Sequence, residues 1–566
     1  FDGLQQTRVE SFDLPGDHPD GGIRLDIKAS FDNPSTIGIE LGAVEFEPRF
    51  KGTPLGLVTV LGLQMKPEAT ASMTMSGQMK PQTDADDLAR VSELMSLFIS
   101  GKDVPVTVHG RSAKAMGERP GELLEVEWLN AAFQQLELSI SLPGSEGMDI
   151  IEGISLEDMS LEFSPETAYA PRMSSKDIAA TYKNPFGFSL GIHKIKEDIE
   201  LLSAGDETPM ASLQLPLQTV ESEGQVIHTS FDNATMTVFG NAHGAFDQFV
   251  ADLTVKSEQA VIFGGKVDTV ARTPIGEVTL LGIPIHTQTV LEGLNGLKDV
   301  PTKVLSVDVT GGNHDYLSIE LVVLMTNPSK IQIATRGYIR FNVGVPGHSG
   351  NLGQAVLRDL QLAHGENEVK AIFQFRPTDA SLGQDFLARY LRGEPEIPVV
   401  IAGADDATNI PSLRRAFSSL ALDSTIAGNQ EQLLVECHAH VPLLTVLWKG
   451  KVRAEVVVHN PFKADMHVLE ISTKVTYKGK TMCEVVGMVT ENFTIPGDST
   501  GQSPTLEMEI DKNFSKLSLA GRFEISADVT FSGKAVVGES PETGYPLTVD
   551  YKQEGLKYFY TELQLL

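Results

Sequence analysis

Apolar and polar residues alternate between residues 316 and 343, and the pair Asn327-Pro328 interrupts the alternation. Alternate side chains of a β-strand share a face, so the apolar residues before this pair predict a half-buried strand. Pro328 has no backbone N–H and cannot continue a sheet ladder, whereas the short side chain of Asn327 can hydrogen-bond nearby backbone at a corner. Alternation resumes at Ile331 and Ile333, and residues 339–343 form a return strand. The pattern therefore predicts strand, Asn-Pro corner, strand, turn, strand.

The same unit occurs four times, at intervals of roughly 130 to 150 residues. Each copy has an alternating strand before its Asn-Pro pair and apolar residues four and six positions after the Asn. One Asn-Pro pair indicates only a turn, but four copies in the same apolar context indicate tandem repeats. The corner residues are Asn33, Pro34, Asn184, Pro185, Asn327, Pro328, Asn460 and Pro461.

Each repeat also predicts one helix, which is clearest in the first copy over residues 86–99. Asp84 or Asp86 can cap its N-terminus, and Gly101 follows its C-terminus. Its apolar residues fall on a single helical stripe. Many short antiparallel strands with one helix per repeat predict a mainly β protein, built of tandem immunoglobulin- or fibronectin-III-like β-sandwiches. The stripe consists of Leu88, Val91, Leu94, Met95 and Phe98.

A chain of 566 residues has room for about four domains, which agrees with the number of corners. We predict repeats over residues 1–125, 126–288, 289–410 and 411–566. The second repeat has an extra hairpin before its corner, and the fourth has a polar, aromatic tail. Short apolar segments between repeats, such as residues 129–138, predict a helical turn that leads into the first strand of the next repeat.

The formal net charge of −30 argues against nucleic-acid binding, which requires clustered Lys and Arg. No apolar run of about 18 residues exists to span a bilayer as a helix. The chain begins at Phe1 without a Met, so a signal peptide or a membrane anchor can precede it in a longer chain.

Two cysteines and three sequons bear on the cellular compartment. Cys437 and Cys483 both lie in the fourth repeat, where they form either a disulfide or two buried free thiols, and the sequence leaves both readings open. The Asn-x-Ser/Thr tripeptides at Asn233, Asn492 and Asn513 favour the secretory route as N-glycosylation sites.

The order of strand, Asn-Pro corner, hairpin, helix and Pro-Val strand resembles the LEA type 2 domain, also called the water-stress and hypersensitive-response domain. The residues that carry the resemblance are the four Asn-Pro corners and Leu291-Glu-Gly-Leu-Asn-Gly-Leu297. The tandem arrangement is similar to a fungal family of repeated LEA-2-like domains that includes a vacuolar-membrane protein implicated in ending autophagy. The resemblance covers nearly the whole chain. It implies an array on the lumenal side of the vacuole, attached through an N-terminal transmembrane helix, with a secreted or cell-surface location as the alternative.

The sequence offers weak candidates for catalysis or metal binding. Gly497 to Gly501 matches Gly-x-Ser-x-Gly around Ser499, but that chemistry needs a helix directly after the serine, and a strand pattern follows here. In a strand, Cys437 would face away from His438 and His440, which argues against a shared metal ion. We therefore expect no catalytic residues, no metal and no cofactor, and we expect that the protein is not an enzyme.

Two functional hypotheses remain, with a hydrolase or carbohydrate-binding domain as a weaker third. LEA-2 domains have been suggested to hold lipid between sheet and helix, and Leu88, Met95 and Phe98 could line such a groove, although each could equally fill a core. This hypothesis makes a lipid or a membrane the partner. The alternative is a structural or adhesive scaffold that self-associates through the edges of its sheets.

Overall fold

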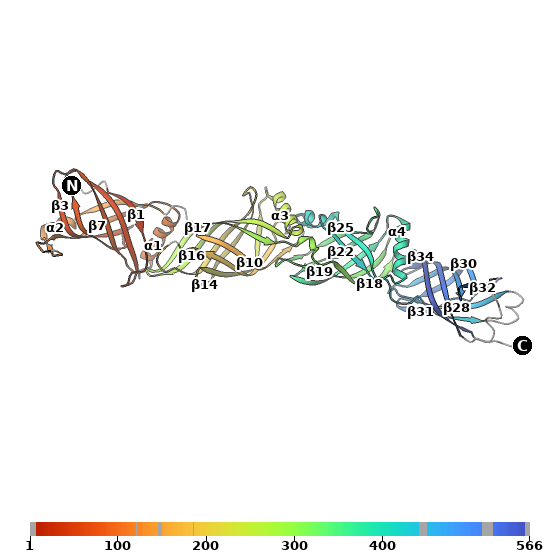
Figure 1. Ribbon diagram of the computed structural model, residues 1–566. Coiled ribbons are helices and arrows are strands. Elements are labelled where there is room, and N and C mark those ends of the chain that lie inside the picture. The colour runs from red at the N-terminus through yellow and green to blue at the C-terminus, as the bar shows by residue number, and fades with distance from the viewer. Residues whose placement is uncertain are drawn as a thin grey trace. The chain divides into compact units, whose positions relative to one another are not determined.

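The computed structural model describes residues 7–119, 121–144, 150–184, 186–440, 450–511 and 524–560. The protein is mainly β, with repeated sandwich-like sheets and a few short helices, as the alternation predicted (Figure 1). The chain divides into two compact units. Unit 1 comprises Phe1–Leu161, Tyr169–Phe246 and Ala260–Leu291, and unit 2 comprises Glu162–Ala168, Asp247–Gln259 and Glu292–Leu566.

The first sheet of unit 1 has the strand order β1-β2-β6-β5-β3-β7-β8, with β4 paired to β3 and β9 paired to β7. Strands β2 and β6 pair without interruption from Ile23–Met79 to Asn33–Ala69. Alternate residues of β2 are buried, because one face of the strand lies on the core. The strands are β1 (Arg8–Asp13), β2 (Ile23–Asn33), β3 (Ile39–Phe50), β4 (Thr53–Pro54), β5 (Gly56–Met65), β6 (Ala69–Met79), β7 (Val104–Met116), β8 (Leu123–Glu125) and β9 (Glu137–Leu142).

The second sheet of unit 1 runs in the order β17-β16-β12-β13-β15-β11-β10, with β14 paired to β15. The stretch in which the extra hairpin of the second repeat was expected forms a single strand, β10, which pairs with the corner strand β11. The hydroxyls of Thr287 and Thr289 donate to the carbonyls of Glu152 and Ile154, at 3.4 and 2.9 Å, so side chains join strand β17 to strand β10. The strands are β10 (Ile151–Phe163), β11 (Arg172–Tyr182), β12 (Gly191–Ser203), β13 (Pro209–Thr219), β14 (Glu221–Glu223), β15 (Val226–Val238), β16 (Glu258–Thr273) and β17 (Gly276–Glu292).

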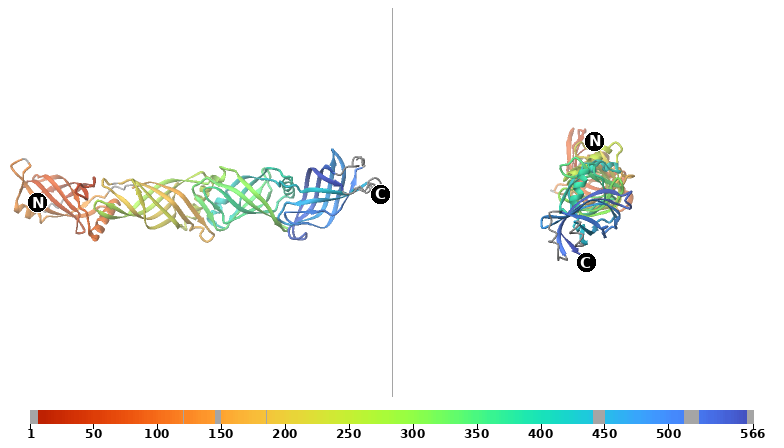
Figure 2. Two further views of the ribbon diagram at one scale, coloured as in Figure 1. Left: turned by 90° about the horizontal axis from the view of Figure 1, so that it is seen from below. Right: turned by 90° about the vertical axis from the view of Figure 1, so that its right-hand side faces the viewer.

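In unit 2, the strands β18-β19-β24-β22-β21-β25-β26 form a closed barrel, coloured green to teal in Figure 2. The parallel pairing of β18 with β26 closes it. The short strands β20 and β23 pair with each other. The strands are β18 (Thr302–Gly312), β19 (Leu317–Asn327), β20 (Gln332–Thr335), β21 (Tyr338–Gly344), β22 (Asn351–Arg358), β23 (Gln361–Leu362), β24 (Gly365–Phe375), β25 (Ile397–Thr408) and β26 (Ala421–Ile426).

The last sheet of unit 2 has the order β27-β34-β33-β29-β30-β32-β28-β31, and β27 also pairs with β28. The pairing of β27 with β34 is parallel, like the pairing that closes the barrel. The strands are β27 (Leu434–His440), β28 (Lys451–Asn460), β29 (Met466–Tyr477), β30 (Lys480–Ile495), β31 (Ser499–Gln502), β32 (Leu506–Ile510), β33 (Glu524–Val537) and β34 (Tyr545–Tyr560).

In each of the first three repeats, a helix follows the fourth long strand, counted from the strand that ends at the Asn-Pro corner. In the first repeat, α1 begins where predicted, because Asp84 accepts hydrogen bonds from the backbone N–H groups of Asp86 and Asp87. Asp379 caps α4 in the same way through Ser381 and Leu382. The helices are α1 (Ala85–Ile99), α2 (Glu127–Phe133), α3 (His243–Val255), α4 (Ala380–Leu391) and α5 (Arg414–Ser418), with 3₁₀ turns at Asn295–Leu297 and Pro411–Leu413.

The linker segments differ from the expectation that they open the next repeat. The helical turns form as α2 and α5, but the strands after them return to the preceding sheet: β9 pairs with β7, and β26 pairs with β25 and β18. The first and third sheets therefore extend past the boundaries drawn at residues 125 and 410. Strand β17 likewise continues past residue 288. Local patterning predicted these elements, whereas only the available sheet edge decides which sheet a strand joins.

Candidate functional site

The four corner asparagines make the same local hydrogen bonds. In each, Oδ1 accepts from the backbone N–H two residues later and Nδ2 donates to the carbonyl four residues later, which replaces ladder bonds at the corner. Pro185 lies outside the described residues, whereas the bonds of its neighbour Asn184 are described. The Oδ1 distances are 3.0, 3.0, 2.9 and 3.1 Å and the Nδ2 distances are 3.0, 2.8, 3.0 and 2.9 Å, for Asn33, Asn184, Asn327 and Asn460 in turn.

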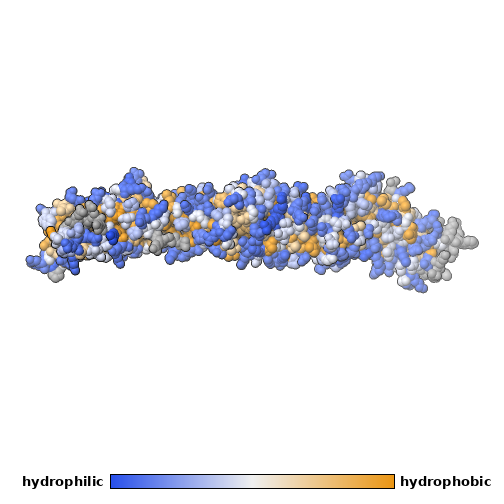
Figure 3. Space-filling view, turned by 90° about the horizontal axis from the view of Figure 1, so that it is seen from above, coloured by the Kyte–Doolittle hydropathy of each residue, from blue (hydrophilic) through white to orange (hydrophobic). Residues whose placement is uncertain are grey.

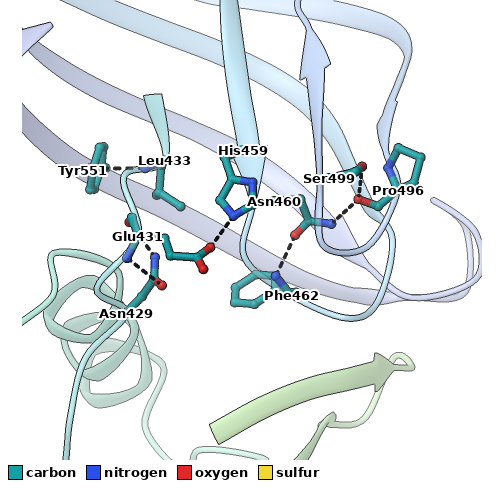
Figure 4. A network of polar contacts seen from close by, with 9 residues as sticks. All are labelled: Asn429, Glu431, Leu433, His459, Asn460, Phe462, Pro496, Ser499 and Tyr551. Carbon is teal, nitrogen blue, oxygen red and sulfur yellow. Dashed lines mark hydrogen bonds and ion pairs between the residues drawn. The ribbon is translucent and has the colours of Figure 1, made fainter. Parts of the chain in front are cut away.

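Three of these side chains also hold the far end of the hairpin that follows. Asn33 donates to the carbonyl of Lys66, Asn327 to that of Leu362, and Asn460 to those of Ile495 and Pro496, at 2.9 to 3.3 Å. These three asparagines are at most 1% exposed. Figure 4 shows Asn460 bridging Phe462 and Pro496 in this way. Each such corner is therefore a buried polar clamp that fixes where two strands diverge.

In unit 1, helix α1 of the first repeat lies along the final strand of the second repeat (Figure 1). Strand β17 is the outer strand of its sheet, so one row of its backbone groups lacks a neighbouring strand. The N–H groups of Thr279 and Leu281 donate to the hydroxyls of Ser92 and Ser96, at 3.0 and 2.9 Å. Serine side chains of the helix thus pair with the strand edge.

The spacing of these serines matches the strand. Ser92 and Ser96 are one helical turn apart and rise about 6 Å along the helix. Thr279 and Leu281 lie two residues apart in a strand and are spaced about 6.6 Å. The two spacings are nearly equal, so the N–H groups of Thr279 and Leu281, on one side of the strand, can each reach one serine hydroxyl of the helix.

The corner of the second repeat contacts the first repeat at the same junction. The N–H of Gly187 donates to the carbonyl of Leu14 at 3.1 Å, and Ser189 bonds Asp17 through both its N–H and its hydroxyl. Phe186 stacks on Phe98 of α1, with ring centroids 6.3 Å apart. A single cluster of buried apolar residues runs from the first sheet into the second. Unit 1 is therefore two sandwiches with a shared interface.

Unit 2 uses the same plan. Arg392, which ends α4, pairs with Asp550 of β34 at 3.1 Å, so this helix also reaches the final strand of the following repeat. The N–H of Ala464, four residues after the corner Asn460, donates to the carbonyl of Val309 at 3.1 Å. Beside it, Lys463 pairs with Asp308 at 2.9 Å.

The three residues predicted to line a lipid groove lie elsewhere in this junction. Met95 is 2% exposed in the core. Phe98 lies between Phe186 and Phe12, whose ring centroid is 5.6 Å away. Leu88 packs against Gly276, where an added Cβ would come within 2.7 Å of Leu88. These side chains therefore pack against protein where the helix meets its own and the following repeat.

An open groove of about 680 Å³ does lie beside α1, on the neighbouring helical stripe. Its lining mixes apolar residues, hydroxyls and charges. Glu93 pairs with Lys51, whereas no ion pair is found within the described residues for the groove lysines, Lys102 and Lys266. Within the first sheet, by contrast, the apolar cavity lined by Met73, Met75 and Met79 has only about 30 Å³. The groove is lined by Ala89, Ser92, Glu93, Ser96, Leu97, Ser100, Lys102, Lys266, Thr279, Leu281, Gly282 and Pro284.

A carboxylate lies inside the second sheet. Glu197 of β12 is 8% exposed, and Gln218 Nε2 lies 3.4 Å from it and 2.8 Å from the hydroxyl of Thr229. Burial raises the pKa of Glu197 to about 7, because the charged form loses its hydration, and the Gln218 hydrogen bond opposes this only in part. The hydroxyl of Thr269, on the adjacent strand, has no partner among the described residues. The core of the second repeat thus holds a polar cluster around a protonatable group.

Both cysteines are buried free thiols in this structure. Burial raises the pKa of Cys437 far above its usual range and that of Cys483 to about 12. The sulfur of Cys483 lies 3.9 Å from that of Met508. The sequence left open either a disulfide or two free thiols, and the structure has two free thiols.

The three sequons have different environments. Asn233 is exposed on β15, and its side chain accepts a hydrogen bond from Arg172 at 3.0 Å. Asn492 lies in β30, but its side chain is outside the described part of the chain, as is the whole of Asn513.

The weak candidates for catalysis and for metal binding lie on two different strands, β31 and β27. Ser499 begins β31 and donates to the carbonyl of Pro496 at 2.7 Å (Figure 4). Cys437 is buried on one face of strand β27, whereas His438 and His440 lie on the opposite face. His438 pairs with Glu436 at 2.9 Å. Across the ranges that the structure describes, no three His, Cys, Asp or Glu side chains are placed to hold a metal ion. In the same ranges, no helix combines the length and the apolar character that a membrane span requires.

Sequence reasoning missed the serines of the junction, the threonines that join β17 to β10 and the buried carboxylate of the second sheet. Ser92 and Ser96 read as ordinary polar positions of a helix, and their spacing by four residues was the one available signal. Thr287 and Thr289 alternate within a strand, as the residues of any solvent-facing row would. Glu197 carried no signal apart from falling among alternating apolar residues.

Comparisons with known proteins leave the function open. The model of a family described as a protein of unknown function (DUF3712) matches residues 1–47 and 208–343. A search of curated proteins found no match. Solved structures found by shape include a Salmonella enterica SafA pilin in complex with the SafB chaperone (11% identity, 50% of this chain and 96% of that chain, TM-score 0.11). A chicken TCR (9%, 51% and 99%, 0.13) and red sea bream transglutaminase (7%, 94% and 95%, 0.19) are also found. Scores this low carry no argument.

Proposed function

We propose that this protein is a non-enzymatic structural array of LEA type 2-like sandwiches, in which the first repeat is locked to the second and the third repeat to the fourth. The observation that carries the proposal is the pairing of Ser92 and Ser96 with the edge of β17. A helix that occupies a strand edge blocks other strands from it and fixes the angle between two sandwiches. The equivalent reach of α4 to β34 supports the same role in unit 2. The LEA-2 resemblance agrees with this role, since the corners recur with equivalent bonds.

Hydrogen exchange of the full chain tests the lock. In the double variant Ser92→Ala/Ser96→Ala, the amides of Thr279 and Leu281 lose their acceptors and should exchange at least about tenfold faster. Ser222→Ala, at an exposed position of β14, is the matched control and should leave both amides unchanged. Unchanged exchange in the double variant would show that the serines do not hold the edge.

A second candidate is lipid contact at the groove beside α1. Its volume falls within the range of small-molecule sites, and its mixture of Leu97, Leu281 and Pro284 with Lys102 and Lys266 suits an amphiphilic anion. Native mass spectrometry of the purified chain, alone and with anionic lipid, tests it. Bound lipid that is lost in Lys102→Glu/Lys266→Glu supports the candidate, and a chain that stays empty counts against it.

The proposed location is the vacuole lumen or the cell surface, with the array attached to a membrane through a segment outside this sequence. The motive is the family resemblance together with the exposed sequon at Asn233. The hydrophilic residues that dominate the visible face in Figure 3 suit contact with water. Microscopy of the full-length protein carrying a C-terminal tag, with protease protection of that tag, tests the location and the orientation.

A further inference from the structure

The hydroxyl of Thr269 is buried inside the second sandwich without a partner. Thr269 lies in β16 and is 3% exposed, and its hydroxyl forms no hydrogen bond to any described residue. An unsatisfied hydroxyl in an apolar core costs stability, so buried polar groups of folded proteins nearly always bond to protein or to ordered water. The hydroxyl therefore indicates a small partner from outside the chain, and water is the commonest one.

The pairing of β12 with β16 places the side chain of Glu197 beside this hydroxyl. In the antiparallel register, Ile195 lies opposite Thr269 and Glu197 lies opposite Val267, and the register is regular between these two pairs. Glu197 and Thr269 are therefore diagonal neighbours on the buried face, with Cα atoms roughly 7–8 Å apart. Their side chains point into the same space, yet no direct hydrogen bond joins them.

The carboxyl group of Glu197 has hydrogen-bonding capacity to spare. Among the described residues, its partner is Gln218 Nε2, at a long 3.4 Å. Burial raises the pKa of Glu197 to about 7, and the protonated carboxyl group present at acidic pH can both donate and accept. The residues directly opposite it on the two adjacent strands, Leu215 and Val267, are buried and apolar. The carboxyl group thus faces an amide and a hydroxyl in otherwise apolar surroundings.

We propose that the core of the second sandwich binds an internal water molecule, which bridges the hydroxyl of Thr269 and the carboxyl group of Glu197. A water spans a gap that is too long for a direct hydrogen bond, since it can accept from one group and donate to the other. Gln218 Nε2 also donates to the hydroxyl of Thr229 at 2.8 Å, so the water extends a chain of polar contacts from β15 to β16. The site lies inside one sandwich and is independent of the locked junction proposed above.

Thermal melting of the full chain at about pH 5.5, where Glu197 holds its proton, distinguishes a bridged hydroxyl from an unsatisfied one. Thr269→Val removes the hydroxyl with little change of shape. If water bridges the site, the variant loses a hydrogen bond and should melt about 2–4 °C below wild type. If the hydroxyl is unsatisfied, its removal should raise the melting temperature, and that result overturns the proposal. Thr237→Val, at an exposed position of β15, is the matched control and should melt as wild type does.

A double-mutant cycle separates the shared water from an effect of packing. Glu197→Met removes the other side of the bridge and keeps a side chain of similar length. In this background, Thr269→Val should no longer lower the melting temperature, because the water has already lost its second partner. Hydrogen exchange of the β16 amides identifies the transition that contains the second sandwich. Equal losses from Thr269→Val in both backgrounds would show that the two side chains share no water.

A crystal structure of the full chain gives the direct observation. We expect a single peak of electron density within roughly 2.5–3.0 Å of both Thr269 Oγ1 and a carboxyl oxygen of Glu197. The peak should be missing in Thr269→Val. A direct bond between the two side chains, an empty site, or a peak with the roughly six or more oxygen ligands of a metal ion overturns the proposal.

Discussion

Replacing Glu197 by Gln is expected to stabilise the second sandwich at alkaline pH and to leave it unchanged at acidic pH. The carboxyl group is 8% exposed, and burial raises its pKa from 4.5 to about 7. The folded protein therefore binds this proton more tightly than the unfolded chain does. This tighter proton binding adds to the unfolding free energy. The contribution is complete below pH 4.5 and disappears as the pH rises through 7.

The size of the effect follows from the pKa shift. A difference of roughly 2.5 pKa units corresponds to about 3 kcal/mol of unfolding free energy. Glutamine has nearly the same shape, stays neutral and can still accept a hydrogen bond from Gln218. At pH 8 the variant should therefore unfold at a temperature roughly 5–10 °C above wild type. At pH 4.5 the two proteins should melt together.

Thermal melting of the full chain between pH 4.5 and 8 measures this difference, with hydrogen exchange in β12 to identify the transition that contains the second sheet. Glu223→Gln on the exposed strand β14 removes the same charge at the surface and should show no comparable trend. A variant that is less stable than wild type at pH 8, or a gain that does not change with pH, would refute the burial argument.

Three further predictions concern the corner, the thiols and the sequon. Asn460→Ala leaves several buried backbone groups without partners and should lower the unfolding free energy by about 3 kcal/mol in urea titrations, whereas the exposed control Asn241→Ala should change it by less than about 0.5 kcal/mol. Cys437 and Cys483 should resist alkylation at pH 8 until the fold opens, because burial raises both pKa values; rapid labelling of the native chain would contradict this. If the chain passes through the secretory route, Asn233→Gln should remove one glycosidase-sensitive mobility shift, and an unshifted wild type would count against that route.

The corners illustrate how far local chemistry reaches. Asn327 and Pro328 predict the end of a strand, because proline cannot donate a backbone hydrogen bond to the sheet ladder and the asparagine side chain can replace the missing bonds. Both partners of the Oδ1 and Nδ2 bonds lie within four residues, so the motif forms wherever it occurs. The second donation of Asn327 goes to the carbonyl of Leu362, which is 35 positions away, and it depends on the closed hairpin.

The helix shows where prediction from sequence ends. The cap at Asp84 and the apolar stripe of α1 were readable, since both follow from helical periodicity. The same stripe was assigned to a lipid groove, yet Met95 lies in the core and Phe98 lies between other rings. Periodicity identifies an apolar face, but it does not identify what covers that face.

The sequence by itself determined the repeated sandwich plan, the strand ends and the helix caps, because these depend on residues within a few positions of one another. Only the tertiary structure decided that β9 and β26 return to the preceding sheets, that two serines complete an edge of the next sandwich, and that Glu197 is buried. Those outcomes depend on which surfaces are free once neighbouring parts have folded.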